Sequence, residues 1–291
     1  MNRHLAVRIG LMETFLDSRW ALLPVSIGLL YLFGLPLLLL TMRESIDLAL
    51  VPVDDDVPLP ESVGGYLADV SAGMSQIGFE QSATVFVPQK DDDVTAIWRL
   101  FINEGEQDRA VASTFYTTIG GEWKVQTQYL EFSTSYEDST MVDTRNNGIV
   151  GAYPTPPQKT ETMAPWFSEP AELYEAHRKV CQLVAGRKRK QCRLHSDFHG
   201  DAVAELAAEC RETYERAEEA GYLHYIGDAR DKRPDDDGSA TGKQARVLKP
   251  TVKGAYLMAW KFMWPFKRIV AGWHLKRSRQ RLERAEVEVK K

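Results

Sequence analysis

The side chains most able to bind a metal lie together just after a basic run. They read Cys192-x2-His195-x-Asp197-x-His199-x-Asp201. Zinc accepts Cys, His and Asp as ligands, and two histidines four residues apart could share one face of a helix. However, a glycine follows His199, Asp201 suits a helix N-cap, and the basic run would repel a cation. A polar loop between two helices is therefore the main interpretation. A metal site at Cys192, His195 and His199 is the alternative.

Three runs of aspartate, at 54–56, 91–93 and 235–237, offer oxygen ligands for calcium. None of them has the alternating acids, the glycine and the terminal glutamate of a calcium-binding loop. We therefore interpret these runs as solvated loops.

A second candidate site lies at the end of a predicted strand, where residues 131–134 read Glu-Phe-Ser-Thr and Asp138 and Asp143 follow. A serine nucleophile needs a positioned histidine and oxyanion donors. His177 could approach from a helix, but it lies on the apolar stripe of that helix, which favours a core histidine with satisfied hydrogen bonds. The chain contains no phosphate loop, dinucleotide fingerprint or hydrolase elbow.

Composition argues against two classes of protein. Three cysteines, Cys181, Cys192 and Cys210, form at most one intramolecular disulfide, which excludes a disulfide-framed scaffold. Residues 249–291 hold 12 Lys or Arg and 3 Glu, which leaves 24 bases against 38 acids elsewhere. An acidic body argues against a nucleic-acid surface. The order helix, hairpin, Thr-x-Lys-Gly and helix over 201–264 resembles the wing end of a winged-helix domain, but no helix-turn-helix pair precedes it.

One uncharged run dominates the N-terminal part of the chain. Residues 20–42 contain no charge and are mostly apolar, which predicts a transmembrane helix because about 20 such residues cross a bilayer. Residues 1–19 have helical apolar spacing and predict an amphipathic tail. Residues 43–59 are acidic and rich in proline, and predict a linker. Arginines before the run and acids after it place the N-terminus in the cytoplasm and the main domain outside, whereas the basic C-terminus favours the cytoplasmic side for the main domain.

The next segment, residues 60–150, predicts an α+β domain. A helix over 60–77 is followed by period-2 alternation and tight turns, which indicate an antiparallel meander of about five strands. The expected strands are 83–88, 94–103, 111–119, 123–133 and 138–144. The helix is expected to cover one face of the sheet, with Trp98 buried beneath it.

The remainder predicts a helical extension over 151–250 and a basic aromatic tail over 251–291. The extension contains expected helices at 168–184 and 201–220, strands at 222–226 and 245–249, and a flexible loop at 227–244. Charges and Pro265 interrupt the tail, so we expect two short amphipathic helices lying at a membrane surface. Lys253, Lys261 and Arg268 fall on one side of an ideal helix, where they would meet anionic headgroups.

Together these patterns predict a single-pass membrane protein of α+β class. We expect it to be a non-enzymatic binding or scaffolding module at the membrane surface. The alternative is a membrane-tethered enzyme, possibly metal-dependent, with its site at the sheet edge or at Cys192, His195 and His199. The expected partners are the lipid bilayer, anionic headgroups and a protein, but no nucleic acid. No residue is assigned a catalytic, cofactor or metal-binding role.

Overall fold

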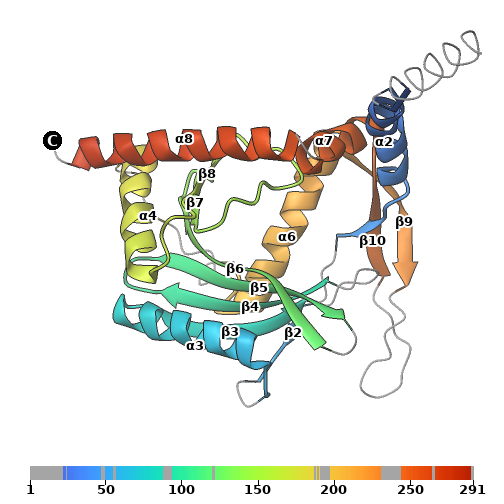
Figure 1. Ribbon diagram of the computed structural model, residues 1–291. Coiled ribbons are helices and arrows are strands. Elements are labelled where there is room, and N and C mark those ends of the chain that lie inside the picture. Colours follow the sequence, from blue (N-terminus) through green and yellow to red (C-terminus); the bar gives the residue numbers. More distant parts are fainter. Residues whose placement is uncertain are drawn as a thin grey trace, which may run out of the picture.

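The computed structural model describes residues 22–23, 25–46, 50–54, 57–87, 94–119, 122–186, 188, 190, 197–230, 244–263 and 266–289. Within these residues the chain is α+β, with a seven-stranded mixed sheet and a separate three-stranded sheet (Figure 1). The prediction of an antiparallel meander of about five strands behind a transmembrane helix is therefore wrong. Its α+β class is retained, but the sheet is larger and includes one parallel pair.

The large sheet has the order β2-β3-β4-β5-β6-β7-β8. Its strands are β2 (Val51–Pro52), β3 (Glu80–Val87), β4 (Val94–Asn103), β5 (Asp108–Ile119), β6 (Glu122–Ser135), β7 (Met141–Arg145) and β8 (Lys159–Met163). All neighbours are antiparallel except β7 and β8, which run parallel in the register Met141 with Lys159. The proline-rich residues between β7 and β8 therefore form a crossover, not merely an irregular connection.

Helices cover both faces of this sheet. On one face, α3 (Glu61–Gln76) and α4 (Pro170–Ala185) enclose the main core, in which Leu67, Phe101, Phe132 and Leu173 are buried. On the other face, α6 (Ala202–Glu219) packs through Leu206 and its neighbours. The result is three layers, and it explains why strands that looked one-sided in sequence carry apolar residues on both faces.

The expected position of Trp98 is wrong because the phase of β4 is shifted by one residue. Ile97 and Phe101 lie in the core beneath α3, and Arg99 points the same way, 3.2 Å from the Ser71 Oγ that accepts its hydrogen bond. Trp98 instead packs beside Leu100 in the cluster that faces α6. A one-residue shift moves every side chain to the opposite face. With both faces apolar, alternation alone cannot choose between them.

The small sheet has the order β1-β10-β9 and forms the other end of the molecule (Figure 1). Its strands are β1 (Glu44–Ser45), β9 (Leu223–Arg230) and β10 (Gln244–Pro250). Residues 43–59, expected as a spacer, thus contribute one strand to each sheet. The two hairpin strands extend into the expected flexible loop, and residues 231–243 of that loop lie outside the described residues.

Two helices close the chain. In α7 (Val252–Phe262) the first turn is capped by Thr251, whose Oγ1 accepts a hydrogen bond from the Gly254 amide at 3.1 Å. The second helix, α8 (Phe266–Val289), runs along one side of the molecule (Figure 1). It begins at α7, which lies beside α2, and extends to α4. The second of the two expected short helices is therefore long, and it packs on the domain through Leu282 and Ser278.

The predicted transmembrane helix over 20–42 is wrong. The described residues 22–23 and 25–39 are helical and include η1 (Leu30–Gly34), a π-helix, and α2 (Leu35–Leu39). In the part of the chain that the structure describes, no helix combines the length and the apolar character needed to cross a membrane. The predicted single-pass membrane location and its topology are corrected with it, and the amphipathic tail lies outside the described residues.

Candidate functional site

The structure separates the side chains of the predicted site at the sheet end. Ser133 and Thr134 are consecutive in β6 and therefore point to opposite faces. The Ser133 hydroxyl donates to Asp143 Oδ1 at 2.7 Å on the face of α6. Thr134 Oγ1 lies 2.8 Å from His177 Nε2 on the face of α4. No serine–histidine pair therefore forms among these residues, and the histidine contacts a threonine.

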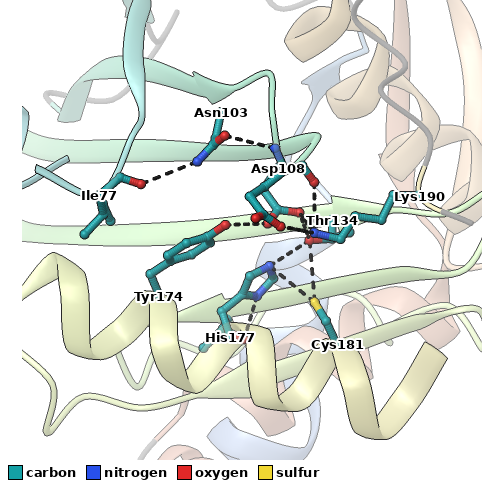
Figure 2. A network of polar contacts seen from close by, with 10 residues as sticks. Ile77, Asn103, Asp108, Thr134, Tyr174, His177, Cys181 and Lys190 are labelled. Carbon is teal, nitrogen blue, oxygen red and sulfur yellow. Dashed lines mark hydrogen bonds and ion pairs between the residues drawn. The ribbon is translucent and has the colours of Figure 1, made fainter. Parts of the chain in front are cut away.

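A buried carboxylate organises the Thr134 side of the sheet (Figure 2). Asp108, which is 2% exposed, accepts hydrogen bonds from Thr134 Oγ1 at 2.6 Å, Tyr174 OH at 2.8 Å and Lys190 Nζ at 2.8 Å. The sequence reasoning missed Asp108 because it follows a tight turn and looked like a turn residue. Its partners lie 26, 66 and 82 residues away along the chain, so no local pattern marks the site.

Proton counting assigns the tautomer of His177. The Thr134 hydroxyl has one proton, which it donates to Asp108, so it accepts from His177 Nε2–H. The other ring nitrogen, Nδ1, lies 3.1 Å from Thr144 Oγ1. His177 is fully buried with both nitrogens in hydrogen bonds, which agrees with the expected satisfied core histidine.

The same network contains a cysteine with an altered acidity. Cys181 Sγ lies 3.5 Å from His177 Nε2 and borders a cleft of about 620 Å³. Burial raises the pKa of this thiol, but His177 and the hydroxyls of Thr134 and Tyr136 outweigh burial and lower it below its ordinary value. The Nε2–H group faces both the Thr134 hydroxyl and the Cys181 thiol, so it is placed to stabilise a thiolate.

A second buried network lies on the opposite face and joins α6 to the sheet. Arg109 pairs with Glu209, and Lys159 Nζ lies 2.5 Å from Asp143 Oδ2. Nearby, Arg145 Nη1 lies 3.5 Å from Glu131 Oε2. Burial, followed by the charge of Asp143, raises the pKa of Glu131 to about 7. These opposite charges neutralise one another, so the network serves packing and orientation.

Most of the predicted metal site lies outside the described residues. This applies to Cys192 and His195, as it does to nearly all of the aspartate runs. His199 lies in a turn with a φ of 51°, outside any helix, and Asp201 caps α6 by accepting from the Ala204 amide at 2.9 Å. Among the described residues, no group of three or more His, Cys, Asp or Glu side chains is placed to hold a metal ion.

An exposed apolar surface lies at the end of the molecule opposite α4. We call it the apolar face. It consists of large side chains that are 41–65% exposed: Leu22, Leu23, Val25, Ile27, Leu29, Leu30, Leu32, Phe33, Leu37, Leu38, Val252, Tyr256, Trp260, Phe262, Ile269 and Trp273. Contact between α2 and α7 brings the two groups of side chains to the same end of the molecule. Scattered exposed apolar residues are normal in a monomer, whereas many large ones gathered at one end indicate an interaction surface.

Basic residues border the apolar face, and two of the three predicted bases also bind main-chain carbonyls. Lys253 Nζ donates to the carbonyl of Ala220 at 2.8 Å, and Lys261 Nζ donates to that of Gly151 at 3.0 Å. Of the three predicted bases only Arg268 is a simple exposed charge. Lysine side chains are long enough to reach neighbouring carbonyls, and contact of the three bases with anionic headgroups stays a prediction.

Comparison of the chain with protein-family models, with curated proteins and with solved structures found no match, so these surfaces and networks are the basis on which its function is argued.

Proposed function

We propose that the protein is a non-enzymatic binding module that docks on an anionic lipid surface. The apolar face enters the outer part of one leaflet without crossing the bilayer, and the bases of α8 lie against the headgroups. The observation that carries this proposal is the exposure of Trp260 and Trp273, each more than half exposed, beside the exposed leucines of residues 22–38. Amphipathic surfaces with aromatic and basic residues bind the interface in this way.

Lipid fits this surface better than a groove on a partner protein does. At 100° per residue, Val25 and Ile27 point to nearly opposite sides of their helix, and both are about half exposed. A protein groove would cover one side of such a helix, whereas acyl chains surround it. Each Lys or Arg near an anionic surface adds about 1 kcal/mol, which suits the 12 bases of residues 249–291.

Vesicle binding by the full chain tests the proposal. The double variant Leu29→Asp with Phe33→Asp should bind vesicles that contain phosphatidylglycerol at least about 100-fold more weakly, because two apolar side chains no longer enter the lipid. Flotation through a density gradient measures the bound fraction. Both positions are half exposed, so the fold should be retained.

Val57→Asp is the matched control, because Val57 is 47% exposed but lies in the loop before α3. It should bind as the wild type does. Equal binding by the double variant, or equal loss in the control, would disprove lipid docking through the apolar face. A complex of defined stoichiometry between two copies of the chain, lost in the double variant, would assign the face to self-association instead.

A further inference from the structure

A cleft of about 400 Å³ lies where α7 and α8 meet the crossover before β8. We call it the basic cleft. Its basic lining residues are Lys159, Lys261, His274, Arg277 and Arg281, and Tyr153, Trp273 and three prolines supply apolar walls. Its volume lies within the usual range for small-molecule sites, and several polar groups converge on it.

Three cations in the basic cleft have no carboxylate within ion-pair distance among the described residues. Lys159 is already paired with Asp143, and the single acidic lining residue, Glu161, lies 3.6 Å from Arg145. Lys261, Arg277 and Arg281 instead contact main-chain carbonyls, a hydroxyl or a ring. The cleft therefore has an excess of positive charge.

Each of these three side chains keeps a donor for a ligand. The Lys261 ammonium has three N–H groups and donates to the carbonyls of Gly151 and Tyr153, which leaves one. Arg281 uses Nη1 for the Glu161 carbonyl and Thr162 Oγ1. Arg277 lies over the Trp273 ring at 4.5 Å, and a stacked guanidinium keeps its in-plane donors available.

The crowding of like charges in the basic cleft also indicates a place for an anion. Burial lowers the pKa of His274, and Lys261 lowers it further, with Arg277 acting in the same direction and Glu161 opposing them. Burial and the neighbouring Arg277 also lower the pKa of Arg281. An anion among these groups would relieve the repulsion.

We propose that the basic cleft binds a phosphate group between Lys261, Arg277 and Arg281. Phosphate matches the forked donors of arginine and the point charge of lysine. The group is carried either by a lipid headgroup or by a small soluble molecule. The lipid source rests on the proposed function, because Trp273 belongs to both the cleft and the apolar face, whereas the soluble source is independent of it.

Titration calorimetry of the full chain with pyrophosphate and with glycerol 3-phosphate, at constant ionic strength, tests the site directly. Arg277→Gln should weaken binding by roughly tenfold or more, as the loss of a charged hydrogen bond predicts. Lys261→Met should weaken it similarly. Arg284→Gln, which removes the same charge from an exposed position of α8 outside the cleft, should leave binding unchanged.

Nuclear magnetic resonance supplies a readout that does not depend on affinity. Saturating pyrophosphate should raise the pKa of His274, because it offsets the charges of Lys261 and Arg277. Arg284→Gln should not alter this shift. An unchanged His274 pKa, or an equal loss of binding in Arg284→Gln, would overturn the site in favour of diffuse attraction.

Vesicles of phosphatidylcholine with or without phosphatidic acid distinguish the two sources. If a lipid supplies the phosphate, Arg277→Gln abolishes the preference for phosphatidic acid and leaves the remaining binding intact. If a soluble molecule supplies it, Arg277→Gln weakens the binding of pyrophosphate or glycerol 3-phosphate and leaves vesicle binding unchanged.

The apolar-face double variant separates the two proposals, because it should lose vesicle binding yet still bind pyrophosphate. No Arg277-dependent binding to any of these probes would refute the phosphate site.

Discussion

At the scale of single residues, the two described cysteines have thiol pKa values shifted in opposite directions. His177 Nε2–H lies beside the Cys181 thiol, whereas burial, with the nearby charge of Glu209, raises the pKa of Cys210 to about 12. Thiolate is the form that reacts with alkylating reagents. The lowered pKa makes thiolate more accessible to Cys181 than to Cys210.

We expect iodoacetamide to label Cys181 before Cys210 in a Cys192→Ser background at pH 8. The rate of Cys181 labelling should rise with pH around a midpoint below the ordinary thiol value of 9.0, because the folded network lowers its pKa. Peptide mass spectrometry follows both sites. Denaturant should abolish the preference, and preferential labelling of Cys210 in the folded chain would contradict the assignment of the network.

Glu131 should give stability a pH dependence of unusual sign for a carboxylate. Its folded pKa of about 7 lies above the ordinary 4.5, so the folded state holds the extra proton between these values. Stability from this group is therefore present below pH 4.5 and is lost as pH rises to 7. As pH rises across that window, the free energy of unfolding of Glu131→Gln should increase relative to that of the wild type by about 1–3 kcal/mol.

Urea denaturation at several pH values measures this difference. Glu122→Gln, at an exposed position of the same strand, provides the control and should follow the wild type. A difference between Glu131→Gln and wild type that stays constant from pH 4.5 to 7 would show that Glu131 is charged throughout.

At the scale of elements, α7 docks on the small sheet through an approach that only glycine permits. A Cβ at Gly254 would lie 2.0 Å from the carbonyl oxygen of Tyr222, which also accepts the Thr251 amide at 2.9 Å. The helix carries part of the apolar face and ends at the basic cleft. Its docking therefore positions both proposed sites.

Gly254→Ala should destabilise the protein by roughly 1–3 kcal/mol or more, because a backbone oxygen cannot move as a side chain can. Gly272→Ala is the matched substitution within α8, where a Cβ meets nothing within 4 Å. It should stabilise by up to about 1 kcal/mol through helix propensity. Thermal denaturation compares the two, and equal effects would mean that α7 is not held against Tyr222.

At the scale of the whole molecule, α8 connects parts that lie far apart in sequence. Its Ser278 Oγ accepts from the Met163 amide of β8 at 2.9 Å, and Leu282 joins the core with α4. The helix thereby joins the end that carries the apolar face to the three-layer body. Because α8 is also the most basic element, this connection places positive charge beside an otherwise acidic domain.

The sequence by itself determined features that depend on neighbours within a few residues. Periodicity predicted α3 and α6, and the caps Asp201 and Thr251 were recognised because a cap bonds within three residues of itself. Alternation indicated the strands from β3 to β7, but it could not select a face where both are apolar. Hydropathy over 20–42 predicted a span, whereas no described helix combines the length and the apolar character needed to cross a membrane.

Only the tertiary structure decided which distant groups meet. Asp108 and Lys190 are 82 residues apart, and Lys261 reaches Gly151 across 110 residues, so no spacing in the sequence relates them. The parallel strand β8, the second covered face and the basic cleft arise in the same way. Such contacts form only after the chain has closed long loops, and the free energy that selects them comes from packing of the whole core.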